Sequence, residues 1–173
     1  FKKCARILGI EDKNIYLVNT DNNGCMHIPS LIKLLDSVLS SGRKVIAVVA
    51  TFGTTFRGAL DPLNQIGIIC KEKKIWFHID ASIGGIFLIG NKKFENINNQ
   101  YISDANSITI NPQKLIGIAK TSSLLLVSNI NTLKNTFKTG LPYIESPDEI
   151  INRGELGIQG SRPAEIIKLW LGL

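Results

Sequence analysis

The chain has 173 residues, of which 44% are hydrophobic and 20% are charged, a composition typical of a globular protein with a buried core. No apolar run approaches the roughly 18 residues of a membrane span, so a membrane protein is not indicated. The net charge of +6 comes from scattered lysines, and because no basic stripe with interleaved aromatic residues is present, nucleic-acid binding is not indicated either.

The start of the chain predicts a helix. Phe1, Cys4, Ala5 and Leu8 recur at helical spacing, the pattern of an amphipathic helix. The last residues, 170–173, are typical of another apolar-faced helix. Because the chain begins with Phe rather than Met and both ends fall inside helices, we expect residues 1–173 to be part of a longer protein.

The next segments predict a strand over residues 15–18, a turn over residues 21–24 and then an amphipathic helix. This helix begins near Ser30 and ends at Gly42. Its apolar residues follow the i, i+3, i+4 and i+7 spacing of a helix packed against a core: Leu31, Leu34, Leu35, Val38 and Leu39.

Residues 45–50 are continuously apolar and mostly β-branched, which predicts a central strand covered on both faces. Asp61 and Pro62 then supply an N-cap acid and a proline at the first helical position. The helix that follows is expected to direct four residues inward: Leu63, Ile66, Ile69 and Cys70.

Three further strands are predicted over residues 75–80, 107–110 and 124–127. Residues 91–104 and 129–157 are polar without a dominant period, which indicates loops. The alternation of helices and strands predicts an α/β fold with a largely parallel sheet.

Two charged residues stand out at the ends of these strands. Asp80 closes the strand over residues 75–80, and Lys114 follows the strand over residues 107–110. Ligands of open α/β sheets bind outside the carboxyl ends of the strands, where an acid and an amine could hold both ends of pyridoxal 5′-phosphate (PLP). Taken singly, Asp80 is more typical of a structural ion pair or a helix-cap acceptor, and Lys114 of a solvated surface lysine. A Schiff-base lysine should lie in a partly desolvated pocket, because it must be neutral to attack.

Residues 51–58 are rich in Thr and Gly and follow a buried strand. Such a loop can contact a phosphate or a ring oxygen, although an ordinary strand-to-helix connection has the same composition. Neither a G-x-G-x-x-G fingerprint nor a phosphate-binding loop is present, so dinucleotide and nucleoside triphosphate binding are not supported. His78 shares a strand face with Asp80, and it is either near the cofactor or a hydrogen-bonded core histidine.

The cysteines indicate neither a disulfide framework nor a metal site. Cys4, Cys25 and Cys70 are odd in number and lack metal-ligand spacing, which favours reduced thiols in a cytoplasmic protein. Only His27 and His78 are available as imidazole ligands, so we expect no metal.

Four segments together resemble the group II pyridoxal-dependent amino-acid decarboxylases, the family of glutamate, cysteine-sulfinate and aromatic amino-acid decarboxylases. They are residues 50–62, 75–85, 104–114 and 158–170, and the resemblance extends over the whole chain in the family's order and spacing. The glutamate and cysteine-sulfinate branch is the most similar one, through residues 58–62. The resemblance implies part of the PLP-binding large domain of the fold-type-I, PLP-dependent transferase-like fold, truncated at both ends, and a homodimer for the full-length protein.

The resemblance also implies roles for individual residues. Lys114 would form the Schiff base and Asp80 would pair with the pyridinium nitrogen. Thr55 would lie near the ring hydroxyl, Asn111 and Gln113 near the phosphate, and Ser82 close to the ring face. Tyr143 falls where the family places the tyrosine of a mobile catalytic loop, with proton donation as its proposed role. Arg162 matches an arginine of the family's C-terminal motif and receives no catalytic step.

Three departures from the family pattern are visible. Gln113 stands where the family usually has a histidine, and glutamine can hydrogen-bond a phosphate but cannot change charge. The family's Asp-Ala-Ala becomes Asp80-Ala81-Ser82. The histidine that stacks on the cofactor ring and the upstream phosphate loop would both precede Phe1.

The leading hypothesis is therefore PLP-dependent α-decarboxylation of an L-amino acid such as glutamate or cysteine sulfinate. One alternative is a catalytically silent remnant of the fold that acts in binding or dimerisation. Another is a PLP enzyme of a different reaction type, such as oxidative deamination. The isolated chain is expected to be inactive.

Overall fold

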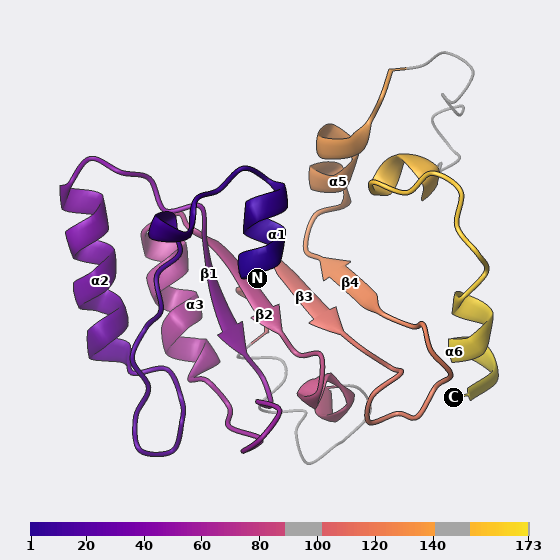
Figure 1. Cartoon of the computed structure of the whole chain (residues 1–173), viewed down its shortest axis with the longest axis horizontal. Helices are drawn as coiled ribbons and strands as arrows, with labels where there is room; N and C mark the ends of the chain where they lie inside the picture. The colour runs from indigo at the N-terminus through magenta and orange to yellow at the C-terminus, as the bar shows by residue number, and fades with distance from the viewer. Residues whose placement is uncertain (89–101, 141–152, 173) are drawn as a thin grey trace.

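The computed structural model describes residues 1–88, 102–140 and 153–172. Figure 1 shows a four-stranded sheet with two helices on the side of its first strand and a looser group of helices from the C-terminal third beyond its last strand. The strands are β1 (Ala47–Thr51), β2 (Trp76–Asp80), β3 (Ser107–Ile110) and β4 (Leu124–Val127). The α-helices are α1 (Lys2–Ile7), α2 (Ile28–Ser40), α3 (Leu63–Glu72), α5 (Ile130–Phe137) and α6 (Ile166–Gly172). Short 3-10 helices are η1 (Asp12–Asn14), η2 (Gly84–Leu88) and η3 (Arg153–Leu156).

The sheet is mostly parallel, as the alternation of helices and strands predicted. The strand order is β1-β2-β3-β4, with β1, β2 and β3 parallel to one another and β4 antiparallel to β3. The register places Thr51 opposite Asp80 and Asp80 opposite Thr109. The carboxyl ends of three strands therefore meet at one edge of the sheet, with Asp80 in the middle.

Helices α2 and α3 build the core against one face of the sheet (Figure 1). On β2, Phe77 and Ile79 are fully buried beneath them, while the alternate residues are only half-buried. The prediction that residues 45–50 would be covered on both faces is wrong for the described part of the chain. Strand β1 buries Val48 and Ala50 but exposes Ala47, because α2 and α3 lie on one face only.

Two further expectations about local structure are wrong. Residues 15–18 do not form a strand, since they pair with no other strand of the described ranges. The turn that follows is present: Asp21 accepts hydrogen bonds from the backbone N–H groups of Asn23 and Cys25 at 2.9 Å each.

Residues 129–157 were expected to be loop, but they contain α5 and η3. Helix α5 is capped by Asn129, whose side chain accepts from the N–H of Asn131 at 2.9 Å.

Asp61 does not cap α3, contrary to the prediction. The N-cap residue is Pro62, and the Asp61 carboxylate accepts backbone N–H groups from two other segments instead. Met26 donates to Oδ1 at 2.6 Å and Thr51 donates to Oδ2 at 2.7 Å. Because both donors are far from Asp61 in the chain, sequence periodicity could not indicate this role.

Helix α1 begins where the sequence pattern predicted, yet it buries no residue. Its last residue, Ile7, is 86% exposed, and Leu8, which follows it, is 73% exposed. Within the described residues no helix is both long and apolar enough to cross a bilayer.

Candidate functional site

The carboxyl edge of the sheet is held together by backbone hydrogen bonds between the ends of β1, β2 and β3. The N–H of Phe52 donates to the carbonyl of Asp80 at 2.9 Å, and the N–H of Ala81 donates to the carbonyl of Thr109 at 2.9 Å. Beyond the strands, the N–H of Gly84 donates to the carbonyl of Phe52 at 3.1 Å. The loops after β1 and β2, which are distant in sequence, are thereby fixed to each other and to β3 around Asp80.

The adjacent glycines explain how these loops approach so closely. A Cβ atom on Gly84 would lie 2.3 Å from the carbonyl oxygen of Phe52, and one on Gly85 would lie 2.8 Å from the side chain of Ile110. Gly53 has a φ of 90°, a conformation that favours glycine. Glycine is thus required where the loops after β1 and β2 cross.

Asp80 is half-buried at the centre of this edge. Its Oδ1 accepts two hydrogen bonds from Ser82, one from the hydroxyl at 2.6 Å and one from the backbone N–H at 3.1 Å. No hydrogen bond to Oδ2 is found among the described residues. The carboxylate is therefore held through one oxygen while the other remains available to a ligand.

His78 lies on the same face of β2 as Asp80 and belongs to a hydrogen-bonded chain of side chains. Its Nδ1 lies 2.8 Å from the hydroxyl of Ser107, and its Nε2 lies 3.3 Å from the hydroxyl of Thr109. Trp76 donates its indole N–H to the same Ser107 hydroxyl at 2.9 Å. Burial lowers the pKa of His78, while the Asp80 charge raises it by a smaller amount. Of the two interpretations above, this arrangement favours the hydrogen-bonded core histidine.

The ring of Phe1 is an additional neighbour of His78. The two ring centroids are 6.0 Å apart with an interplanar angle of 68°, an edge-to-face contact. The start of the described chain therefore lies beside the sheet face that carries His78 and Asp80.

Lys114 ends a turn that follows β3. Its backbone N–H donates to the carbonyl of Asn111 at 2.9 Å, and Pro112 within the turn is fully buried. The Lys114 side chain is exposed, which differs from the expectation of a partly desolvated amine, because the described residues leave this edge of the sheet open.

Asn111 and Gln113 fix the Lys114 turn to the segment before β4. The Ser123 hydroxyl donates to Oδ1 of Asn111 at 2.6 Å, and the backbone N–H of Ser122 donates to Oε1 of Gln113 at 2.7 Å. Both side-chain carbonyls are occupied in this way. Their amide nitrogens are the groups that remain to meet an anion.

The remaining predicted site residues are placed as follows. Thr55 is exposed in the turn after β1, whereas the neighbouring Thr54 is structural, because its hydroxyl accepts the N–H of Ala59 at 2.9 Å. Tyr143 lies outside the described residues.

Sequence reasoning missed Asp61, Ser107 and Ser123 as supports of the site. A buried serine within β3 was an available signal for Ser107, but no local pattern distinguished the other two.

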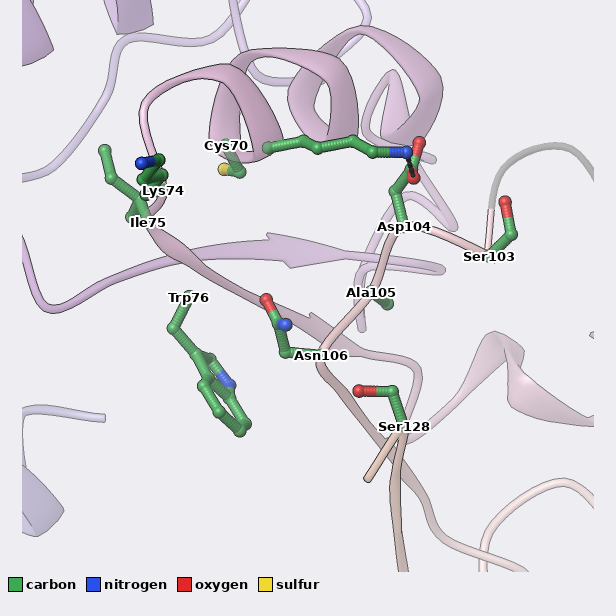
Figure 2. A pocket seen from close by; sticks show the side chains of 10 residues that line it. Cys70, Lys74, Ile75, Trp76, Ser103, Asp104, Ala105, Asn106 and Ser128 are labelled. Atoms are coloured by element: carbon green, nitrogen blue, oxygen red, sulfur yellow. Dashed lines mark hydrogen bonds and ion pairs between the residues drawn. The ribbon is translucent and has the colours of Figure 1, made fainter. Parts of the chain in front are cut away.

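A separate cavity of about 490 Å³ opens at the opposite, amino end of β2 and β3, and Figure 2 shows its lining. None of the predicted site residues lines it. The pair between Lys71 and Asp104, 2.8 Å apart, is marked there by a dashed line. Cys70, also in the lining, is buried, which raises the pKa of its thiol to about 11. Among the described residues, no group of three or more His, Cys, Asp or Glu side chains could hold a metal ion.

The whole chain, residues 1–173, matches the family model described as the pyridoxal-dependent decarboxylase conserved domain. The acidic amino acid decarboxylase GADL1 of Xenopus tropicalis is 36% identical over 98% of the chain, and the L-aspartate decarboxylase dtxS4 of Metarhizium robertsii is 31% identical over 98% of it. The chain spans about a third of the length of these relatives, 34% of each.

Solved structures have the same fold. Mouse CSAD superposes with a TM-score of 0.87 at 30% identity, covering 98% of the chain and 35% of the mouse protein. Oryza sativa TDC with PLP and tryptamine gives a TM-score of 0.90 at 21% identity, over 99% of the chain and 36% of the rice protein; this likeness concerns the fold alone. The expected fold-type-I architecture is thus confirmed for this part of the molecule.

Proposed function

Because the chain belongs to the pyridoxal-dependent decarboxylase family, we propose that it is part of a PLP-dependent enzyme that removes the α-carboxylate of an L-amino acid. The observation that carries this proposal is the position of Asp80. Its carboxylate sits at the middle of the carboxyl edge of a parallel sheet, where ligands of such sheets bind, and one of its oxygens is already immobilised by Ser82.

The residues at this edge fit the cofactor. Asp80 supplies a fixed acceptor for a protonated ring nitrogen, Lys114 supplies a primary amine for the aldehyde carbon, and the Asn111 turn supplies amide donors for a phosphate. PLP, when bound, provides the electron sink that stabilises the carbanion left by departing CO2.

Each side chain then has a defined task in the proposed enzyme. Asp80 would keep the proton on the ring nitrogen, and Lys114 would hold the cofactor through its amine. Thr55, whose side chain is exposed, would place its hydroxyl near the ring hydroxyl of the cofactor. Gln113 and Asn111 hold the phosphate through their amide N–H groups, without the charge that a histidine at position 113 could add. His78 shares the strand face of Asp80 and would influence the cofactor as the neighbour of that carboxylate.

We further propose that the substrate is an acidic L-amino acid, such as glutamate, aspartate or cysteine sulfinate. Two relatives at or above 31% identity are called an acidic amino acid decarboxylase and an L-aspartate decarboxylase. The support for this step is the similarity to these two relatives.

The test is to trap the cofactor in the full-length protein that contains this chain. Borohydride reduction of the PLP-loaded protein, followed by peptide mass analysis, should label Lys114, and a Lys114→Ala variant should lose the label. Release of CO2 should then be measured with glutamate, aspartate, cysteine sulfinate and an aromatic amino acid. A label on another lysine, or the absence of CO2 from all four substrates, would contradict the proposal.

A second reaction type has one observation in its favour. Rhodiola rosea 4-hydroxyphenylacetaldehyde synthase superposes on the chain with a TM-score of 0.86 at 25% identity, so an aldehyde-forming reaction occurs on the same fold. Tyr143 is the proposed proton donor for decarboxylation. If it has this role, Tyr143→Phe should raise the ratio of aldehyde to amine among the products.

The assembly and location of the protein stay predictions. We propose a cytoplasmic homodimer for the full-length protein and no activity for residues 1–173 alone. Large apolar side chains such as Leu125, Leu126 and Trp170, which are 56%, 49% and 82% exposed, indicate surface that further chain or a partner would cover. Sedimentation of the full-length protein tests the homodimer, and a CO2 assay on the isolated chain tests its expected inactivity.

A further inference from the structure

Ser82 makes two hydrogen bonds to the same oxygen of Asp80. The hydroxyl donates to Oδ1 at 2.6 Å and the backbone N–H donates to Oδ1 at 3.1 Å. A hydroxyl donor to a carboxylate at this distance is a charge-assisted hydrogen bond, the stronger kind. The Ser82 hydroxyl is therefore turned toward Asp80 rather than toward the space outside the sheet edge.

The consequence of this contact is an asymmetric carboxylate. The terminal torsion of an aspartate is broad and roughly two-fold, so an untethered Asp80 could present either oxygen, or neither, in the direction of a ligand. With Oδ1 tied to Ser82, rotation about this torsion breaks a hydrogen bond. The untied Oδ2 then keeps one direction, which is the condition for a short hydrogen bond to a ring nitrogen.

The surroundings hold Ser82 in place for this role. Asp80 lies between Thr51 and Thr109 in the sheet register, and Gly84, two residues after Ser82, is locked by its N–H to the carbonyl of Phe52. A Cβ on Gly84 would collide with that carbonyl at 2.3 Å. The backbone of the turn that carries Ser82 is thus anchored to the loop after β1, which holds Ser82 beside the Asp80 carboxylate.

We propose that Ser82 is a positioning residue that orients the Asp80 carboxylate toward the ring nitrogen of PLP and keeps that nitrogen protonated. This inference rests on the proposed function and extends it to a residue whose hydroxyl is absent from the Asp-Ala-Ala pattern. Alanine at position 82 would keep the backbone donor but lose the shorter, stronger bond. Threonine would keep both donors.

The experiment compares wild type, Ser82→Ala and Ser82→Thr in the full-length protein. PLP affinity is measured by titrating the cofactor-free protein, and the protonation of the ring nitrogen is measured by solid-state 15N NMR with 15N-labelled PLP. We expect Ser82→Ala to weaken PLP binding by about three- to tenfold. The variant loses the hydroxyl hydrogen bond to Asp80, and only part of the free energy of that bond contributes to PLP binding. Its 15N resonance should move from the pyridinium position toward that of neutral pyridine.

Ser82→Thr should lie closer to wild type than Ser82→Ala in both measurements. Ser41→Ala is the matched control, because the Ser41 hydroxyl donates to the carbonyl of Val38 at 2.7 Å at the end of α2, outside the Asp80 site. It should change neither reading.

Two results would overturn the inference while the proposed function stands. In one, wild type carries PLP on Lys114 but Ser82→Ala has unchanged affinity and an unchanged 15N resonance. In the other, Ser82→Thr equals Ser82→Ala, so that the hydroxyl is not the operative group. If wild type takes up no PLP on Lys114, the proposed function itself fails and this inference falls with it.

Discussion

The backbone N–H of Thr51 donates to Oδ2 of Asp61 at 2.7 Å. Thr51 is the last residue of β1 and the register partner of Asp80, so this bond fixes the strand end next to the candidate site. The second oxygen of Asp61 accepts the N–H of Met26 at 2.6 Å. One half-buried carboxylate thus joins β1, the segment before α2 and the start of α3.

Removing the Asp61 carboxylate should therefore destabilise the protein. Asp61→Ala leaves two backbone N–H groups without their acceptor, and we expect the free energy of unfolding to fall by about 2–4 kcal/mol. Asp61→Asn keeps one acceptor oxygen and should lose less. Urea denaturation of the full-length protein measures the difference. Equal stability of wild type and Asp61→Ala would show that water replaces both bonds at no cost.

Gly84→Ala should disturb the loops around Asp80. The new Cβ would lie 2.3 Å from the carbonyl oxygen of Phe52 and 2.8 Å from its ring, so the backbone must shift, at about 1–3 kcal/mol. We expect a lower melting temperature together with weaker PLP binding. Gly160→Ala is the control, because a Cβ there meets nothing within 4 Å. A Gly84→Ala protein with normal PLP affinity would show that the loop crossing does not position the site.

His78 should make stability fall as the pH falls. Burial lowers the pKa of its imidazole below the usual 6.5, against a smaller opposing effect of Asp80. Below pH 6.5 the unfolded chain then binds more protons at this position than the folded one, so the contribution to stability is complete above pH 6.5 and is lost as the pH falls from 6.5 through the lowered pKa of the folded state. The urea midpoint of wild type should decline between pH 7.5 and 5 more steeply than that of His78→Gln. Parallel declines would mean that His78 titrates alike in both states.

Cys70 should resist alkylation in the folded protein. Burial raises the pKa of its thiol to about 11, so only about one molecule in a thousand carries the reactive thiolate at pH 8. With iodoacetamide and peptide mass analysis, Cys70 should stay unlabelled while the exposed Cys4 reacts. All three cysteines should react in urea. Equal labelling of Cys4 and Cys70 without denaturant would contradict the burial of Cys70.

Local patterns predicted most of the elements and misplaced a few for identifiable reasons. The apolar repeat of α2 and the strand pattern that ends at Asp80 were sufficient, because side-chain spacing follows directly from backbone geometry. Helix α5 was missed because its three apolar residues stand among Asn, Thr and Lys residues, so the segment reads as polar. They are Ile130, Leu133 and Phe137. Residues 15–18 have strand-like composition, but a strand also needs a partner, and composition does not provide one.

The sequence by itself determined the fold class, the family resemblance, and the choice of Asp80 and Lys114, because residue type and spacing along the chain carry that information. Only the tertiary structure decided that Thr51, Asp80 and Thr109 lie in register, that Asp61 joins three segments instead of capping a helix, and that the Ser82 hydroxyl is directed at Asp80. Each of these depends on which groups meet across the sheet edge. These contacts are determined by the packing of segments that are distant in the chain, and local sequence patterns do not indicate them.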